Sequence, residues 1–251
     1  YFDDDTWEWN GTSWTQKNPV SKPSTRYYHS MAYDVLRNIV VLFGGTGNSM
    51  SNQETWEWNG TDWVQRTGNT CTGTNCYICS ESTCPSHYSD AAMVYDKERK
   101  KTVLFGGRNY DGSNDETWEW NGVIWNKLNP ENKPSARYSH SVVYDELRKK
   151  VMLFGGEGDH QGYDDLWEWN GINWILHDPV KKPLPRDGHA MSYDLIRNKV
   201  VLFGGSPGSD ETWEWDSGAN NKPVQVLNIA FDSSGITDLN IQSLSVYFNA
   251  G

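Results

Sequence analysis

A four-residue segment, Thr-Trp-Glu-Trp or a near copy of it, occurs five times along this chain of 251 residues. The copies begin at Thr6, Thr55, Thr117, Leu166 and Thr212. All fourteen tryptophans belong to this recurring unit, ten of them in the Trp-x-Trp pairs and four a few residues downstream. Self-similarity at a period of about fifty residues is typical of propellers, solenoids and other repeat architectures. We therefore expect the tryptophans to be mainly scaffold residues that pack between repeats.

Each unit contains four strand signals at regular spacing. The first two are a segment ending in Tyr-Asp and an apolar run ending in Phe-Gly-Gly, such as Ile39–Phe43. The third is Thr-Trp-Glu-Trp, whose alternation places both tryptophans on one face and the glutamate on the other. The fourth surrounds the last tryptophan, as in residues 63–65. Four antiparallel strands repeated in this way predict an all-β fold, a β-propeller of four-stranded blades.

Two kinds of turn are expected to join these strands. The Asn-Gly pairs predict a tight hairpin turn with positive φ at both turn residues. The Tyr-Asp-x-x-Arg segments are expected to tie their hairpins by Asp–backbone hydrogen bonds and surface ion pairs. The double glycine after the second strand permits close approach of a neighbouring backbone. The Asn-Gly turns begin at Asn10, Asn59, Asn121 and Asn170, and the Asp/Arg pairs are Asp34/Arg37, Asp96/Arg99, Asp145/Arg148 and Asp194/Arg197.

The apolar run with Gly-Gly, followed by spaced aromatic residues, resembles the kelch repeat. The version with Phe-Gly-Gly and Thr-Trp-Glu-Trp-Asn-Gly is similar to bacterial extracellular kelch-like proteins over residues 1–216. Kelch repeats usually have Tyr where this chain has the second Trp of each pair. The resemblance implies a kelch-type propeller with about four to five blades in this chain.

The units suggest a division of the chain. A partial blade is expected at 1–16, full blades at 17–66, 85–128, 129–178 and 179–232, and a cysteine-rich insertion at 67–84. Residues 233–251 are expected to form a C-terminal strand segment or the start of a further β domain. The partial first blade leads us to expect a fragment of a longer protein and a larger propeller. A compact propeller closed by pairing its first residues with its last is the alternative.

All four cysteines lie in the insertion, at Cys71, Cys76, Cys79 and Cys84. A cysteine-dense loop predicts two disulfides and an oxidising compartment, and hence a secreted or cell-surface protein. The resemblance to bacterial extracellular kelch-like proteins implies that this location is bacterial. A four-thiolate zinc or iron–sulfur site is the alternative, but the spacing lacks two Cys-x2-Cys pairs. Four cysteines allow three pairings, and the sequence does not choose among them.

The net charge of −11 argues against nucleic acid and anionic membrane surfaces as partners. No apolar run approaches the length of a membrane-spanning helix. Phosphate loops, zinc-protease motifs and dinucleotide fingerprints are all missing from the sequence. We therefore expect a protein without enzymatic activity.

Two repeated polar patterns could carry chemistry. An Arg-x-x-His pair recurs in three units but is replaced by Tyr88 and Ala91 in the second, and its periodicity favours a structural role over acid–base catalysis. Its copies are Arg26/His29, Arg137/His140 and Arg186/His189. Acidic pairs before Thr-Trp, such as Asp115-Glu116, could bind calcium, although the alternating ligand pattern of a dedicated site is missing. No other metal or cofactor is expected.

Function is therefore expected where the repeats differ. The loops between strands two and three and between strand four and the next blade share one side of a propeller, here called the loop face. The candidate ligand-binding residues on it are Tyr28, Arg108, Tyr110, Tyr138, Asp159, His160 and Asp187. They predict a secreted binding or adhesion scaffold for a protein or glycan. The alternatives are a carbohydrate-active propeller, either a lectin or an enzyme resembling galactose oxidase or sialate epimerases, and a structural spacer in a multidomain surface protein.

Overall fold

The computed structural model describes residues 3–47, 52–67, 71–72, 75–76, 83–86, 88–179, 181–208, 210–216 and 225–227. Residues 233–251 lie outside this part, as does most of the cysteine-rich insertion. The described residues form strands, turns and loops, and they include no helix capable of spanning a membrane. The chain divides into two compact units, Tyr1–Glu131 with Ser135–Tyr138, and Asn132–Pro134 with Ser139–Gly251.

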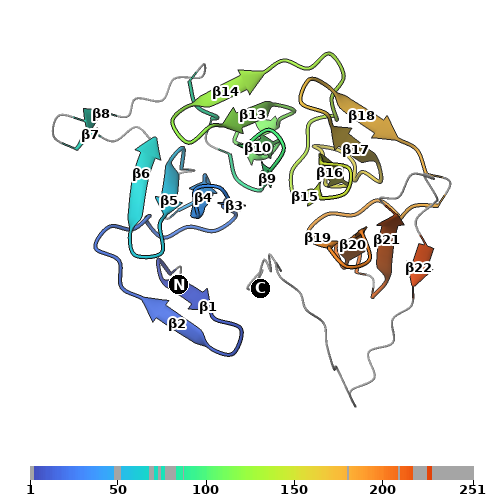
Figure 1. Ribbon diagram of the computed structural model, residues 1–251. Coiled ribbons are helices and arrows are strands. Elements are labelled where there is room, and N and C mark those ends of the chain that lie inside the picture. Colours follow the sequence, from blue (N-terminus) through green and yellow to red (C-terminus); the bar gives the residue numbers. More distant parts are fainter. Residues whose placement is uncertain are drawn as a thin grey trace. The chain divides into compact units, whose positions relative to one another are not determined.

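The described first unit contains two four-stranded sheets and three two-stranded ones, one of which is the N-terminal hairpin (Figure 1). The N-terminal hairpin consists of β1 (Thr6–Trp9) and β2 (Trp14–Lys17). The first blade consists of β3 (Ser30–Asp34), β4 (Ile39–Phe43), β5 (Thr55–Trp58) and β6 (Trp63–Thr67). The second blade consists of β9 (Ala92–Asp96), β10 (Lys101–Phe105), β13 (Thr117–Trp120) and β14 (Trp125–Leu128).

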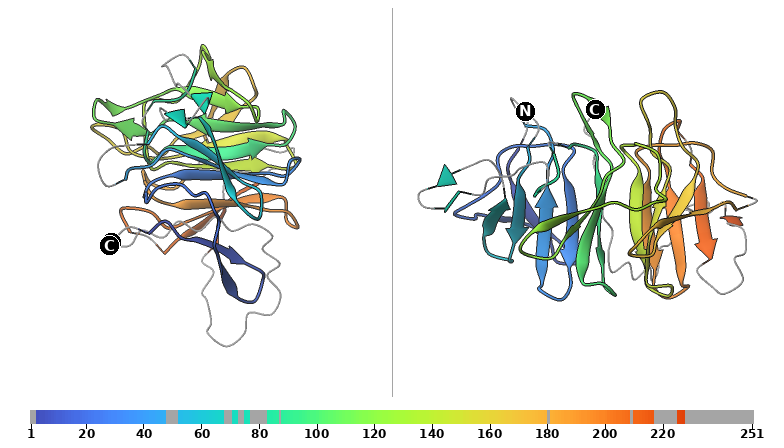
Figure 2. Two further views of the ribbon diagram at one scale, coloured as in Figure 1. Left: turned by 90° about the vertical axis from the view of Figure 1, so that its left-hand side faces the viewer. Right: turned by 90° about the horizontal axis from the view of Figure 1, so that it is seen from above.

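Two short strand pairs accompany these blades. β7 (Cys71–Thr72) pairs with β8 (Asn75–Cys76) in the cysteine-rich insertion, and Figure 2 shows this pair projecting outward beyond β6. β11 (Arg108–Asn109) pairs with β12 (Gly112–Ser113) in the loop between the second and third strands of the second blade. Neither pair follows from the repeat, because both lie in segments that differ between units.

The second unit contains two more four-stranded sheets. The third blade consists of β15 (Ser141–Asp145), β16 (Lys150–Phe154), β17 (Leu166–Trp169) and β18 (Trp174–His177). The fourth consists of β19 (Ala190–Asp194), β20 (Lys199–Phe203), β21 (Thr212–Asp216) and β22 (Gln225–Leu227). In all four blades the strands are antiparallel and ordered as in the sequence. This is the topology of a propeller blade, so the predicted fold class is confirmed.

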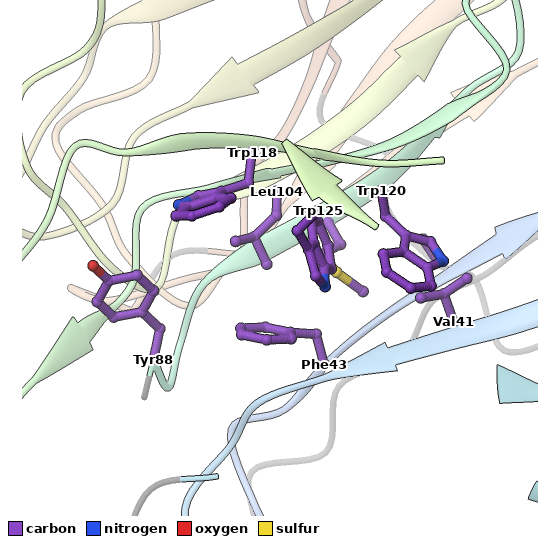
Figure 3. Packing of buried hydrophobic residues seen from close by; sticks show 9 residues of the cluster. Val41, Phe43, Tyr88, Leu104, Trp118, Trp120 and Trp125 are labelled. Carbon is purple, nitrogen blue, oxygen red and sulfur yellow. The ribbon is translucent and has the colours of Figure 1, made fainter. Parts of the chain in front are cut away.

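Aromatic side chains fill the space between the first and second blades (Figure 3). Trp118, Trp120 and Trp125 of the second blade are at most 2% exposed. The ring of Trp125 meets the ring of Phe43 edge to face, with 5.4 Å between the ring centres. The predicted scaffold role of the tryptophans therefore holds in this pair of blades, where each indole buries a large apolar area.

The Phe-Gly-Gly segments end the second strand against the backbone of the next blade. The N–H of Gly45 donates to the carbonyl oxygen of Tyr88 at 3.1 Å. A Cβ added to Gly44 would lie 2.4 Å from the same oxygen, and Gly44 has a φ of 72°. Both features require glycine, as the sequence predicted.

The Asn-Gly turns differ from the expected two-residue form. Trp9 pairs with Trp14, so four residues connect β1 to β2. The side-chain oxygen of Asn10 accepts hydrogen bonds from the N–H groups of Thr12 and Ser13 at 2.9 Å each. Only the glycine has positive φ, 94° at Gly11. The prediction of positive φ at both positions was wrong because the asparagine side chain closes the turn itself.

The Tyr-Asp-x-x-Arg turns join the first two strands of each blade. Oδ1 of Asp34 accepts hydrogen bonds from the N–H groups of Leu36 and Arg37 at 3.1 Å each. The guanidinium of Arg37 then binds Asp34 at 2.6 Å and Glu57 at 2.7 Å. Asp34 and Glu57 are 4% and 1% exposed. The Asp–backbone bonds and the ion pair were both predicted. The carboxylates of the pair are buried, whereas Arg37 itself is exposed.

Candidate functional site

The residue two positions before the first strand of each blade has left-handed backbone geometry. These residues are Tyr28, Asp90, Ser139 and Gly188, with φ of 57°, 55°, 51° and 63°. In the first unit the N–H of Asp90 donates to the carbonyl of Tyr28 at 3.0 Å, and in the second Gly188 donates to Ser139 at 2.8 Å. Within each unit the backbone itself thus holds the loop-face residues of two adjacent blades in register.

Arg108 is placed by the residues that follow the second strand. It exchanges two backbone hydrogen bonds with Ser89, of 2.9 and 3.0 Å, immediately after the double glycine of the second blade. Ser89 in turn precedes Asp90 at the start of the first strand. The side chain of Arg108 therefore starts from a fixed point next to the left-handed positions.

Three of the seven predicted ligand-binding residues come together around this side chain. The Cζ atom of Arg108 lies 4.3 Å from the ring centre of Tyr138 and 5.9 Å from that of Tyr28. Tyr27 packs edge to face on Tyr28, with 4.7 Å between ring centres. Guanidinium groups are attracted to aromatic faces at such distances. We call the set Tyr28, Asp90, Arg108 and Tyr138 the Arg108 cluster.

Asp90 fixes one edge of the guanidinium. Its Oδ2 lies 3.1 Å from both Nε and Nη2 of Arg108. Among the described residues Nη1 has no hydrogen-bond acceptor. The Arg108 side chain is 41% exposed, so this nitrogen is accessible to a ligand. A planar donor group thus lies between two rings with one of its nitrogens open to an incoming acceptor.

Asp90 is not among the binding residues that the sequence predicted. Asp90 could have been identified by the position that it shares with Tyr28 and Ser139, because Asp tolerates a positive φ better than most residues. Sequence spacing alone does not show that a loop arginine eighteen positions later pairs with it, at 3.1 Å.

The other four candidates lie outside the Arg108 cluster as it is defined here. Tyr110 lies between β11 and β12 and is 86% exposed. Asp159 and His160 are exposed in the second unit, whereas Asp187 is half-buried there. Asp187 exchanges backbone hydrogen bonds with Ser206 at 2.8 and 3.2 Å. The structure therefore assigns these four to exposed or backbone-pairing loop positions.

The Arg-x-x-His pairs lie in the interior of the propeller units. Arg26 is 8% exposed and donates to the carbonyl of Gly44 at 3.0 Å and to Glu54 at 2.6 Å. Burial, reinforced by the nearby Arg26 charge, lowers the pKa of His29 to about 4. Burial and Arg186 lower the pKa of His189 to about 3. Neutral buried imidazoles of this kind favour the structural role over acid–base chemistry.

The second blade replaces this arginine without losing its contact. Tyr88 donates its hydroxyl to Glu116 at 2.9 Å, and Glu116 occupies the position of Glu54. Burial first, and then Glu116, raises the pKa of Tyr88. In these two blades an acidic residue thus accepts a hydrogen bond from whatever donor stands at the arginine position.

The acidic residues considered as calcium ligands have another structural use. The carboxylate before each Thr-Trp accepts the indole N–H two residues later, at 2.9 Å for Trp56 and Trp118. The same bond is 2.7 Å at Trp167 and 3.0 Å at Trp213. Across the described ranges, no group of three or more His, Cys, Asp or Glu side chains is gathered closely enough to hold a metal ion.

The cysteine-rich insertion is described only in part. Cys84 is 4% exposed and disulfide-bonded. The backbone register of β7 and β8 places Cys71 opposite Cys76. The side chains of Cys71, Cys76 and Cys79 lie outside the described part, so the two predicted bridges stay a prediction.

These blades can now be compared with known proteins. Residues 91–233, more than half of the chain, match the family model of the KLHDC2/KLHL20/DRC7 Kelch-repeats domain. The chain belongs to the kelch-repeat family. No curated protein matches it. The matched residues span the second, third and fourth blades, and a kelch propeller is consistent with a scaffold that binds other proteins.

Proposed function

We propose that this kelch chain is a secreted, non-enzymatic scaffold that binds a protein partner through the Arg108 cluster. The supporting observation is the arginine held between Tyr28 and Tyr138 and oriented by Asp90. Arginine and tyrosine are the residue types that most often dominate protein interfaces. Because the cluster is already ordered, binding it costs little conformational entropy.

The opposite, turn-bearing side of the blades offers less to a ligand. Its charged motif is committed to the fold, since Arg37 binds Asp34 and Glu57, and Arg197 binds Asp194 and Glu214. These contacts recur because every hairpin needs them. Among the described blades the Arg108 cluster occurs once, and no folding requirement explains its composition.

Secretion, a cell-surface bacterial location and further domains in a longer protein are parts of this proposal. They rest on the cysteine-dense insertion, the buried disulfide-bonded Cys84 and the resemblance to bacterial extracellular kelch-like proteins. The net charge of −11 also keeps nucleic acid outside the proposed partners.

A photo-crosslinking amino acid at position 110 would capture the partner, because Tyr110 is 86% exposed beside the cluster in sequence. Arg108→Glu should then weaken binding of the captured protein by about thirtyfold or more, the effect of losing a central arginine. The matched control is Lys100→Glu, the same charge change on an exposed residue of a Tyr-Asp-x-x-Arg turn. Binding that survives Arg108→Glu but not Lys100→Glu would reverse the assignment of the face. Binding of oligosaccharides on a glycan array with the same sensitivity would favour a lectin instead.

A further inference from the structure

The four Asn-Gly turns share one sequence frame and differ at the position after the glycine. Each follows the tetrad as Trp-Glu-Trp-Asn-Gly, so the repeat itself supplies the asparagine and the glycine. The next residues, in chain order, are Thr12, Thr61, Val123 and Ile172. Asn10 and Asn59 therefore begin Asn-x-Thr triplets, the acceptor sequence for N-linked glycans in exported proteins. No other asparagine of the chain begins an Asn-x-Ser or Asn-x-Thr triplet.

The turn of the first blade uses the side-chain oxygen of Asn59 and leaves the nitrogen open. Oδ1 accepts hydrogen bonds from the N–H groups of Thr61 and Asp62, at 2.9 Å each. Nδ2, the atom that carries an N-linked glycan, has no hydrogen-bond partner in the part of the chain that the structure describes. Asn59, Gly60 and Thr61 are all exposed. The folded turn thus presents both an amide nitrogen and, two residues later, a hydroxyl to solvent.

The turn of the N-terminal hairpin has the same arrangement. Nδ2 of Asn10 donates one hydrogen to Oγ of Ser13 at 3.3 Å, and an amide nitrogen has a second hydrogen to lose. Asn10, Gly11 and Thr12 are exposed. A glycan replaces one hydrogen of Nδ2 and keeps the side-chain carbonyl. Neither turn would therefore lose the backbone hydrogen bonds that close it.

The base of the Asn59 turn is held by the segment that leads into the first blade. Oδ1 of Asp62 accepts a hydrogen bond from the N–H of Ser21 at 2.8 Å. The carbonyl of Ser21 accepts one from the N–H of Trp63 at 3.3 Å. These contacts engage the last residue of the turn and the first of β6, whereas residues 59–61 stay exposed. A bulky group on Asn59 has solvent to occupy and displaces no packed side chain.

A neighbouring blade does not cover such a turn. Arg37 of the first blade lies beside the Asn-Gly turn of the second, where a Cβ added to Gly122 would be 2.8 Å from its Nη1. Asn121 is nevertheless exposed, and Val123 is 75% exposed. The asparagine and the residue after the glycine therefore stay accessible with an adjacent blade in place.

We propose that Asn10 and Asn59 are acceptor sites for N-linked glycans. The inference rests on the secretion that forms part of the proposed function. The donor is an oligosaccharide joined through a diphosphate to a polyisoprenoid lipid. Nδ2 forms a bond to C1 of the first sugar as the C1–O bond to the diphosphate breaks. The lipid diphosphate leaves, and Nδ2 gives up one proton.

A glycan on Asn59 would lie far from the proposed binding cluster within the first unit. β5 begins at Thr55, beside the loop that follows the second strand, and ends at Trp58, next to the Asn-Gly turn. Arg108 follows the corresponding second strand of the second blade, and its cluster is therefore at the other end of the strands. Glycans shield the turn-bearing side and leave the Arg108 cluster open to a partner.

Glycopeptide mass spectrometry of the full chain tests the proposal. The chain is exported through an attached signal sequence in a eukaryotic and in a bacterial host, each with an oligosaccharyltransferase. A flexible Asn-x-Thr tag on the same chain reports that the transferase acts. Peptides holding Asn10 and Asn59 should carry a glycan. Modification of the tag alone in both hosts would overturn the proposal.

Two reciprocal variants exchange the residue after the glycine between blades. Thr61→Val, the residue found in the second blade, should remove the glycan at Asn59 and leave that at Asn10. Val123→Thr should create a glycan at Asn121. Thermal unfolding should match the parent chain, because the turn asparagines are kept. A glycan at Asn59 that persists in Thr61→Val would contradict the assignment.

The binding experiment with Arg108→Glu separates this inference from the proposed function. Removal of the glycans should leave binding of the captured partner unchanged, because the Arg108 cluster stays open with or without them. Unmodified asparagines with normal Arg108-dependent binding would sink the glycan sites alone. Modified asparagines with binding that ignores Arg108→Glu would sink the binding cluster alone.

Discussion

The contact between the first and second blades differs from that between the third and fourth. In the former, Trp125 fills the space beside Phe43 and donates its indole N–H to Thr55 at 2.8 Å. In the latter, Leu166 stands at the position of Thr55, and the sequence has no tryptophan after Trp215. Donor and acceptor are thus lost together. The pairing avoids a buried hydroxyl without a partner, which would cost about 1–3 kcal/mol.

The second tryptophan of the Thr-Trp-Glu-Trp tetrad also makes different contacts in the two units. Trp120 donates to Glu57 at 3.0 Å in the first unit. In the second, Nε1 of Trp215 is buried and has no hydrogen-bond partner among the described residues. Its ring instead lies 5.5 Å from Cζ of Arg148 and 5.7 Å from the ring of His177. A cation facing the indole ring replaces the carboxylate that faces its edge.

The space that Trp125 fills in the first unit has an open counterpart in the second. An apolar cavity of about 30 Å³ lies between the third and fourth blades. It is lined by Phe154, Leu166, Pro179, Lys182, Pro183, Met191, Val200, Leu202, Trp213 and Trp215. The comparison teaches that one repeat register accepts two kinds of contact, one tightly filled and hydrogen-bonded, the other apolar and looser.

Trp125→Ala should have the largest effect on this contrast. The substitution should destabilise the first unit by about 3–5 kcal/mol, as large core truncations do, because the side chain is 2% exposed and packs on Phe43. Denaturant unfolding with hydrogen exchange read separately in each unit would measure it. The control is Val123→Ala in the preceding turn, where Val123 is 75% exposed. A loss equal to the control's would show that the filled contact adds nothing over the looser one.

Reduction of disulfides should lower the stability of the first unit only, because the insertion that holds all four cysteines belongs to that unit. Each bridge should contribute roughly 2–4 kcal/mol in the chain-entropy model. From the backbone register of β7 and β8, we predict a Cys71–Cys76 bridge, which leaves Cys79 for Cys84. Peptide mapping without reduction checks the pairing. Four titratable thiols, or an equal effect of reductant on both units, would contradict this prediction.

How far the sequence predicts each part of the molecule depends on how local the cause is. The strands and the Asp34–backbone bonds follow from the repeat, because each needs only residues of its own hairpin. The exposure of Trp7 and Trp9 does not, since an identical tetrad is buried or exposed according to the strand beside it. The solvent exposure of these tryptophans therefore depends on the strand that lies beside the tetrad, not on the tetrad's own sequence.

The candidate site shows the same limit. The sequence placed Tyr28, Arg108 and Tyr138 on one face because loops of matching register meet there. It could not show that Asp90 orients Arg108, because that contact depends on a backbone bridge between two segments with no shared pattern. Nor could it show that Tyr110 stands apart, at the tip of a strand pair that occurs once.

Acidification should weaken both units, since each buries a histidine. The folded-state pKa is about 4 for His29 and about 3 for His189, both depressed mainly by burial. Between these values and the unfolded value of about 6.5 the unfolded chain binds more protons, so stability falls as pH drops below about 6.5. At pH 5 the loss should be about 2 kcal/mol per histidine.

Unfolding measured at pH 7.5 and pH 5 checks this effect. His29→Gln should flatten the pH dependence in the first unit only, and His189→Gln in the second only. An unchanged dependence in both variants would mean that these imidazoles titrate normally and are not buried as neutral groups.

The smallest expected effect concerns the cation beside Trp215. Arg148→Met removes the guanidinium from the ring but keeps an apolar stem, so the second unit should lose about 0.5–1 kcal/mol. Part of that loss belongs to the 3.7 Å contact of Arg148 with Glu168. A double-mutant cycle with Trp215→Phe separates the two terms, because only the ring contact couples the two positions directly. Lys149→Met, at the exposed neighbouring position, is the control and should change little. A coupling near zero would show that the looser contact relies on burial alone, without an attraction in place of the indole–carboxylate bond of the first unit.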